Sequence, residues 1–191
     1  NVAEPYMSGV GGIGLALVYV AKEDRVRALN FSGRAPRAAE PDRFTDENKE
    51  TGVLSSLVPG NVAGWLTLHE TYGLLDRERL FQPAIEYAEN GVPITPWSSL
   101  MMSRSAPRLS LFPSASIILD GNGKPPRPGA RLKMPQLAAS LRAIAGGGQE
   151  AFYRGELAER IVKANREMGG LLTLEDMAEH RAEWQEPIQV S

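Results

Sequence analysis

Ser32 and Arg34 are the two residues whose types and spacing are best suited to hold a ligand. They stand two positions apart just beyond an extended run, Arg25–Phe31, and side chains at this spacing on extended backbone point to the same side. A guanidinium can bind a carboxylate through two parallel hydrogen bonds, and a hydroxyl can donate or accept one more. The pattern therefore predicts substrate binding by Ser32 and Arg34. The alternative is a surface ion pair between Arg34 and a carboxylate of residues 37–52.

A cluster of glycines precedes this run and has the spacing of a nucleotide-binding motif. Gly9, Gly11 and Gly14 follow the pattern G-x-G-x-x-G, which binds a dinucleotide when a strand precedes it and a helix follows it. Here the apolar run Gly14–Val20 follows and predicts a strand, so that no helix N-terminus would meet a pyrophosphate. We therefore expect no cofactor. Instead, we expect the glycines to bring backbone close to a site or to another strand.

Other residues with catalytic or metal-binding chemistry are few, because the chain has two histidines and no cysteine. His69 is predicted to lie in the core on the apolar face of a helix, and His180 at a helix end, where a cation is favoured. Neither has a second ligand at metal-binding spacing, and no serine stands in a G-x-S-x-G motif. We therefore expect neither a metal site nor a catalytic residue within these 191 residues.

Composition argues against two classes of partner. The formal net charge is −2, which provides no electrostatic attraction toward nucleic acid or an acidic membrane surface. The longest apolar run, Ile13–Ala21, is much shorter than the about 20 residues that a membrane-spanning helix needs. We expect neither nucleic acid nor a membrane as a partner, and the sequence leaves the cellular compartment open.

Strands are predicted mainly near the two ends of the chain. Gly14–Val20 and Arg25–Phe31 are joined by four residues, three of them charged, and predict a hairpin. Gly52–Gly60 is predicted as a short strand closed by a Pro-Gly turn, and Ser116–Leu119 as another short strand before a turn. The last residues, Ile188–Ser191, predict the beginning of a further strand.

Helices are predicted for the middle of the chain from apolar residues at helical spacing and from start and stop signals. They cover Asn61–Tyr72, Asp76–Asn90, Pro96–Ser105, Pro135–Ala145, Gln149–Met168 and a short segment from Thr173 to about His180. Asn61 is expected to cap the first helix, and Pro83 favours a start of the second near Phe81. Thr173 and Asp176 predict a capping box. The sum predicts one α+β domain over residues 1–191, mostly helical with a few strands.

Seven blocks of this sequence resemble, in the same order, the large subunit of γ-glutamyltranspeptidases. The blocks are Glu4–Gly12, Leu57–Gly64, Tyr72–Gly73, Leu80–Ile85, Ala88–Val92, Phe152–Gly155 and Gly169–Asp176. The resemblance implies an N-terminal-nucleophile hydrolase, in which a single precursor cuts itself and frees a Thr whose own α-amino group is the base for its hydroxyl. The fold that it implies is a four-layer αββα sandwich.

The chain departs from the family pattern at the nucleophile. The family's Thr-Thr-His sequence is absent, and the chain begins at Asn1 without an initiator Met. Residues 1–191 are therefore expected to be an incomplete large-subunit portion of a longer, autoprocessed precursor. This portion is expected to be inactive alone and to pair with its own small subunit. The expected substrate is a small amide or γ-glutamyl compound.

A second departure falls on the predicted binding pair. The family typically has Asp-Phe-Arg-Glu where this chain has Asn30-Phe31-Ser32-Gly33, so Ser32 stands in the place of an Arg that grips the substrate carboxylate. Arg34 can replace that Arg from the same strand face, starting about 6–7 Å further along. The Ser-Gly-Arg-Ala-Pro form is similar to that of transpeptidase-like acylases, including those grouped with cephalosporin acylases. We therefore expect an amide hydrolase. The alternatives are a true γ-glutamyl transferase or glutathione hydrolase, and a non-catalytic binding or structural member.

Overall fold

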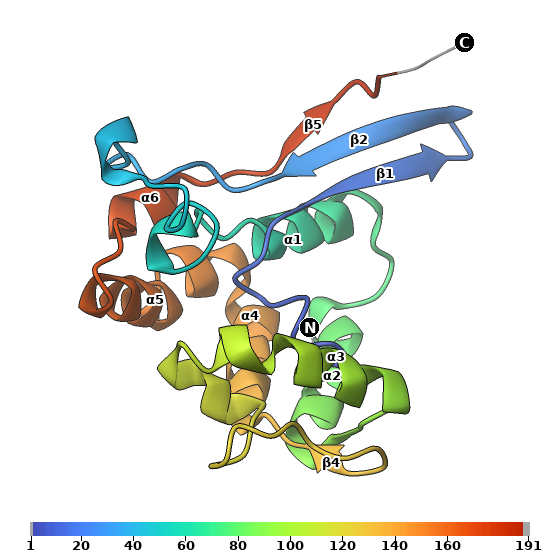
Figure 1. The fold of residues 1–191 in the computed structure, drawn as a ribbon. Helices are drawn as coiled ribbons and strands as arrows, with labels where there is room; N and C mark the ends of the chain where they lie inside the picture. Colours follow the sequence, from blue (N-terminus) through green and yellow to red (C-terminus); the bar gives the residue numbers. More distant parts are fainter. Residues whose placement is uncertain (1, 189–191) are drawn as a thin grey trace. The chain divides into compact units, whose positions relative to one another are not determined.

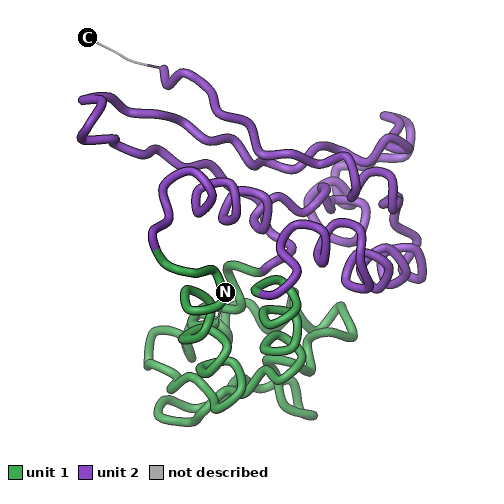
Figure 2. The backbone as a smooth tube through the Cα atoms, turned by 180° about the vertical axis from the view of Figure 1, so that it is seen from behind, with its two compact units in different colours: residues 1–9, 75–145 green, residues 10–74, 146–191 purple. Residues whose placement is uncertain are grey.

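The computed structural model describes residues 2–188, which form two compact units. Unit 1 comprises the residues up to 9 and residues 75–145, and unit 2 comprises residues 10–74 and those from 146 onward (Figure 2). Helices predominate and strands are few, so the mixed α+β class predicted from the sequence is confirmed (Figure 1). Among the described residues, no helix combines the length and the apolar character needed to cross a membrane.

Unit 2 is built around a three-stranded antiparallel sheet with β2 in the middle (Figure 1). β1 (Gly14–Val20) and β2 (Arg25–Phe31) form the predicted hairpin with the predicted bounds, and they pair along their whole length. β5 (Glu183–Gln185), which the sequence did not predict, pairs with the other edge of β2. The strand predicted to begin at Ile188 lies, apart from that residue, outside the described part of the chain.

Helix α1 (Asn61–Tyr72) covers one face of this sheet (Figure 1). Leu29 and Phe31 of β2 are almost fully buried, at 0% and 7% exposure. Gly64 allows the helix to approach closely, because a Cβ at this position would lie 2.2 Å from Cγ of Phe31. The core of unit 2 therefore includes the contact between β2 and α1.

The segment before α1 is not the strand predicted for Gly52–Gly60. Val53–Ser55 is a turn of 3₁₀ helix, and the buried Val58 donates its N–H to the carbonyl of Arg34, beyond the end of β2, instead of to a strand partner. Asn61 is the first residue of α1 and not its cap. The amides of the first turn find other acceptors: the N–H of Asn61 donates to the carbonyl of Gly12, and the N–H of Ala63 donates to the hydroxyl of Tyr153.

Gly155 breaks the single helix predicted over Gln149–Met168, and a second glycine interrupts the helix that precedes it. Helix α4 (Pro135–Tyr153) has a non-helical residue at Gly148, with φ 62° and ψ −144°, a conformation that residues with a side chain rarely adopt. Helix α5 (Glu156–Glu167) then begins after Gly155, whose backbone is extended. The apolar pattern of residues 149–168 therefore belongs to two helices.

Helix α6 (Leu174–Glu179) begins at the capping box that the sequence predicts. The hydroxyl of Thr173 accepts a hydrogen bond from the Asp176 N–H at 3.1 Å, and a carboxylate oxygen of Asp176 accepts one from the Thr173 N–H at 3.0 Å. The prediction is confirmed. Both bonds are local, so a segment of four residues is enough to specify them.

Unit 1 is mainly helical. Its regular elements are α2 (Arg77–Asn90), β3 (Val92–Pro93), α3 (Pro96–Leu109), a 3₁₀ segment (Pro113–Ile117), β4 (Arg131–Leu132) and α4 as far as Ala145. Strands β3 and β4 pair in antiparallel fashion. A further 3₁₀ turn, Pro41–Arg43, belongs to unit 2.

Two predictions for unit 1 are wrong. Helix α2 begins at Arg77 and runs through Pro83, not from near Phe81. Its buried stripe, which includes Ile85, offsets the about 3 kcal/mol that an interior proline costs. The strand predicted at Ser116–Leu119 is a helical turn instead, because the amide of Leu119 bonds to a carbonyl four residues earlier.

Candidate functional site

The backbone at the end of β2 is packed directly against a neighbouring segment. Gly33 cannot carry a side chain, because a Cβ there would lie 1.8 Å from the carbonyl oxygen of Val58. Gly60 is under the same constraint, because a Cβ there would lie 1.8 Å from the carbonyl oxygen of Phe31. Between these contacts the Val58 N–H donates to the carbonyl of Arg34 at 3.0 Å. Arg34 therefore projects from backbone that is held on both sides.

The glycine loop before β1 meets the same segment. The carbonyl of Gly12 accepts hydrogen bonds from the N–H groups of Gly60 and Asn61, each at 2.9 Å. Gly14 leaves room for the ring of Phe31, since a Cβ would lie 2.5 Å from it. As the sequence predicts, these glycines allow close approaches: Gly12 meets the segment before α1, and Gly14 lies against Phe31 of β2. A strand rather than a helix follows them.

Arg34 and Glu183 are in contact at this strand end, and Ser32 precedes Arg34 by two residues; we call these three residues the strand-end site. Ser32 is half-buried, and its N–H donates to Oδ1 of Asn30 at 2.9 Å. The Arg34 side chain is 81% exposed, and its Nη2 donates to Oε1 of Glu183 at 3.0 Å. An ion pair is therefore present, but its partner comes from β5 and not from residues 37–52. Because the Arg34 side chain is largely exposed, its guanidinium remains accessible to a ligand despite this ion pair.

The strand-end site adjoins an apolar surface, the open face, which is the side of the sheet opposite α1. Three β1 side chains are strongly exposed on it: Leu15 at 72%, Leu17 at 73% and Tyr19 at 61%. Residues that pair directly across a sheet point to the same face. Leu15 pairs with Asn30 and Asn30 with Glu183, so the side chains of Asn30 and Glu183 also lie on the open face. Because Arg34 reaches Glu183, its guanidinium lies at the end of this face.

Tyr153 holds the segment before α1 from the core side, and sequence reasoning missed it. Its hydroxyl donates to the carbonyl of Pro59 at 2.8 Å and accepts from the N–H of Ala63 at 3.0 Å. Burial raises the pKa of Tyr153, so the hydroxyl stays protonated and can keep its donor role. The one available signal was its place in a family-like block, Phe152–Gly155.

His180 lies next to this tyrosine and is buried. Its ring centroid is 5.6 Å from that of Tyr153, and its Nε2 has no hydrogen-bond partner among the described residues. Burial lowers the pKa of His180, and the positive charges of Arg34 and Arg181 lower it further, while Glu183 acts in the opposite direction. His180 does follow a helix end, as predicted, but the expectation of a favoured cation there is wrong.

His69 lies on α1 and is half-buried, not buried in the core as the sequence predicts. Within residues 2–188 there is no group of three or more His, Cys, Asp or Glu side chains that could hold a metal ion. The strand-end site offers a guanidinium, a hydroxyl and a carboxylate. This set of groups is suited to binding an ionic ligand.

Another ion-paired arginine lies close to the strand-end site in the sequence. Arg37 contacts Glu175 and Glu179 of α6 through its side chain, and its N–H donates to Oδ1 of Asp176 at 3.1 Å. Like Arg34, it is exposed. Its carboxylate partners belong to a helix, whereas the partner of Arg34 belongs to the sheet.

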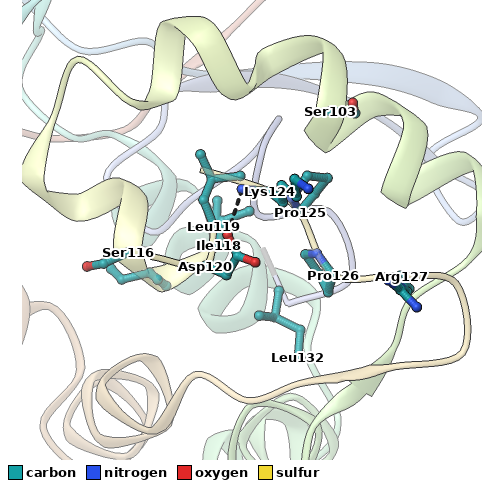
Figure 3. A pocket seen from close by; sticks show the side chains of 11 residues that line it. Ser103, Ser116, Ile118, Leu119, Asp120, Lys124, Pro125, Pro126, Arg127 and Leu132 are labelled. Atoms are coloured by element: carbon teal, nitrogen blue, oxygen red, sulfur yellow. Dashed lines mark hydrogen bonds between the residues drawn. The ribbon is translucent and has the colours of Figure 1, made fainter. Parts of the chain in front are cut away.

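Unit 1 contains a separate hollow of about 700 Å³ (Figure 3). Its lining combines apolar side chains with charged ones, among them Ile118, Leu119, Leu132, Asp120, Lys124 and Arg127. Oδ1 of Asp120 accepts hydrogen bonds from the N–H groups of Asn122 and Lys124, at 2.9 and 2.8 Å, and these bonds lower the pKa of Asp120. The carboxylate is therefore engaged by its own turn, and the sequence did not predict this hollow.

Comparisons with known proteins agree with the resemblance seen in the sequence. A family model described as Gamma-glutamyltranspeptidase matches residues 1–191. The "Glutathione hydrolase-like YwrD proenzyme" of Bacillus subtilis (strain 168) is 33% identical over 98% of this chain and 36% of that protein. The "Acylase ACY 1 proenzyme" of Pseudomonas sp. (strain SE83) is 34% identical over 100% of this chain and 36% of that protein.

Comparison with solved structures agrees with the sequence matches. The crystal structure of Helicobacter pylori γ-glutamyltranspeptidase matches with a TM-score of 0.91 at 30% identity, over 98% of this chain and 56% of that chain. This chain spans just over a third of the length of the two curated relatives. Because the family model matches the whole sequence, this chain belongs to the γ-glutamyltranspeptidase family.

Proposed function

We propose that this chain is the large-subunit portion of an amide hydrolase of the γ-glutamyltranspeptidase family. In this proposal Ser32 and Arg34 bind a carboxylate of the substrate, and the Thr nucleophile belongs to a part of the protein outside residues 1–191. The proposal rests on one observation above all, the exposed guanidinium of Arg34 on tightly packed backbone at the end of the open face.

Rigid backbone makes the strand end suitable for positioning a substrate. Gly33 and the Val58 N–H fix the main chain on either side of the Arg34 side chain. A binding group on fixed backbone is already in place when the substrate arrives, so less conformational freedom is lost on binding. The packing of this segment therefore favours a role in substrate placement.

The open face supports assembly with another part of the protein. Its exposed row of apolar side chains, Leu15, Leu17 and Tyr19, has the two-residue spacing that a second sheet covers in a β-sandwich. Covering such a row stabilises an assembly by about 25 cal/mol for each Å² of apolar surface. We infer that the small subunit covers the open face and thereby brings its Thr close to Arg34.

The proposed reaction is amide hydrolysis through an acyl-enzyme. The Thr hydroxyl gives its proton to its own α-amino group and attacks the amide carbonyl, and the amine leaves with a proton. Water then attacks the ester, releases the acid and restores the Thr. Arg34 contributes a bidentate bond to the substrate carboxylate and Ser32 a further hydrogen bond, so this chain binds and orients the substrate. Alone it is expected to be inactive.

We infer that hydrolysis of an acyl amide is favoured over γ-glutamyl transfer. The two curated relatives include a glutathione hydrolase-like proenzyme and an acylase proenzyme at nearly equal identity, so identity does not choose between them. The position of Arg34, two residues beyond the place of the family's usual Arg, supports an acyl group of different length. A glutathione-analogue assay on the processed protein tests the γ-glutamyl alternative: faster turnover of that analogue than of a carboxylate-bearing acyl amide would favour it.

Replacing Arg34 tests the proposed site directly. In the complete, processed protein Arg34→Ala is expected to raise KM for carboxylate-bearing amides about 10- to 100-fold, because charge-assisted hydrogen bonds are lost, with little change in kcat. Arg37→Ala, which removes another exposed, ion-paired arginine, is the matched control and should leave KM unchanged. An unchanged KM for Arg34→Ala would remove this residue from the site.

A non-catalytic member of the family is the alternative from a different functional class. Its discriminating feature is the sequence that follows residue 191 in the complete protein. A Thr at a cleavage site there supports the enzyme, whereas its absence supports a binding or structural module.

A further inference from the structure

Glu183 is the one carboxylate that contacts the Arg34 side chain within the described residues. It is the first residue of β5 and pairs across the sheet with Asn30, which places it on the open face beside the strand end. Its Oε1 accepts from Nη2 of Arg34 at 3.0 Å. The two residues are 149 positions apart in sequence, so the tertiary fold alone brings them together.

The contact uses only a small part of the guanidinium. An Arg side chain has five N–H donors, four of which form two forks, and each fork can bind a carboxylate through two parallel bonds. A single oxygen on Nη2 occupies one of these donors and leaves one complete fork free. Glu183 can therefore hold Arg34 while a substrate carboxylate binds the same guanidinium.

We propose that Glu183 is a positioning residue that fixes the Arg34 guanidinium at the end of the open face, with one fork left free for the substrate carboxylate. This inference rests on the proposed function, because it assigns a role within the same site. An unrestrained Arg side chain has many rotamers and loses this freedom when it binds a ligand. A partner on a strand removes part of that freedom beforehand, so the substrate meets a cation already in place.

The backbone of both partners is fixed, which makes the positioning specific. Arg34 is held through Gly33 and the Val58 N–H, and Glu183 is held in the ladder with β2. The pair formed by Arg37 offers a contrast, because its partners Glu175 and Glu179 lie on helix α6. That pair is also exposed, but its carboxylates do not belong to the sheet.

Kinetics of the complete, processed protein test the proposal with a carboxylate-bearing amide and an uncharged analogue of the same length. Glu183→Ala is expected to raise KM for the charged substrate about three- to tenfold, with kcat changed less than about twofold, because an exposed pair has a modest effect. Glu183→Gln keeps an acceptor oxygen and should raise KM less. Neither substitution should alter KM for the uncharged analogue.

A double-mutant cycle shows whether Glu183 acts through Arg34. In an Arg34→Ala background, Glu183→Ala should cause no further rise in KM, because there is no guanidinium left to position. Glu179→Gln is the matched control, since it removes a carboxylate from an exposed arginine pair outside the site, and its KM should equal that of the parent protein. Unchanged far-UV circular dichroism should accompany each variant, since all of the exchanged side chains are exposed.

The outcomes separate this inference from the proposed function. If Arg34→Ala raises KM and Glu183→Ala does not, the positioning role is overturned and the proposed function stands. A fall in KM for Glu183→Ala also overturns it, because Glu183 would then compete with the substrate. If Arg34→Ala has no effect on KM, both proposals fail.

Discussion

The two faces of the three-stranded sheet carry the same class of side chain in different surroundings. Leu29, on the face covered by α1, is 0% exposed, whereas Leu17, on the open face, is 73% exposed. The cause is the helix, which Gly64 allows to approach β2 closely. The alternation of a strand determines which side chains share a face, but the element packed on that face determines what the face does. One face stabilises this chain, and the other is suited to a partner.

The strongest test of this comparison is the contact at the end of the covered face. Gly60→Ala would place a methyl group 1.8 Å from the carbonyl oxygen of Phe31, and one of these backbone segments would have to move. We expect a loss of at least about 3 kcal/mol in the free energy of unfolding, measured by urea denaturation with tryptophan fluorescence. Gly11→Ala is the control, because its Cβ would meet nothing within 4 Å. Equal stability of the two variants would contradict the close packing described here.

The next largest effect is expected within the covered face itself. Leu29→Ala removes a fully buried side chain between β2 and α1, and such truncations cost about 2–5 kcal/mol through lost burial and a cavity. The measurement is the same urea titration. A loss below about 1 kcal/mol would mean that α1 is not packed on this face as the structure describes.

Acidification should reveal a smaller effect through His180, beside Tyr153. Its pKa is lowered from 6.5 in the folded state, chiefly by burial, so the unfolded chain takes up a proton at higher pH than the folded chain. Stability rises with pH wherever the unfolded state binds more protons. The free energy of unfolding should therefore be level above about pH 7 and should fall as the pH drops below about 6.5 toward the folded-state pKa.

Urea titrations between about pH 7.5 and 5.5 test this dependence. His180→Gln should flatten it over that range, whereas His69→Gln, which alters the other histidine of the chain, should retain it. A slope that survives in the His180 variant would assign the pH dependence to other groups.

The smallest effect is expected on the open face. Leu17→Ala should change the free energy of unfolding of this chain by less than about 0.5 kcal/mol, because the side chain is already in contact with water. Paired with Leu29→Ala, it compares two leucines of one hairpin on opposite faces. A loss for Leu17 as large as that for Leu29 would show that the open face is packed within this chain, and the comparison would fail.

Local patterns made part of this fold predictable. The hairpin follows from two short runs typical of strands and a charged connection, and α6 follows from Thr173 and Asp176, because the interactions that define them lie within a few residues. β5 was missed because Glu183–Gln185 is too short to show alternation, and its pairing with β2 defines it as a strand. Pro83 misled the prediction of α2 because burial of one helix face outweighs the local cost of the proline.

The candidate site was predictable to a similar extent. The run Arg25–Phe31 was enough to place Ser32 and Arg34 just beyond a strand end, and their role in binding stays a prediction. The glycines were enough to predict close backbone contacts. The partner Glu183 could not be predicted, because its distance in sequence leaves no local signal. Tyr153, His180 and the unit 1 hollow depend likewise on contacts between distant segments.

β1 is an edge strand of the sheet, and this has a consequence for how such a chain folds after synthesis. The described strands pair with only one side of β1, so its outward N–H and C=O groups can join a strand from another molecule. The exposed leucines of β1 make such intermolecular strand pairing more favourable. A newly made polypeptide would therefore need to shield this edge early, by folding the rest of its length onto it or by recruiting a chaperone, before neighbouring copies aggregate.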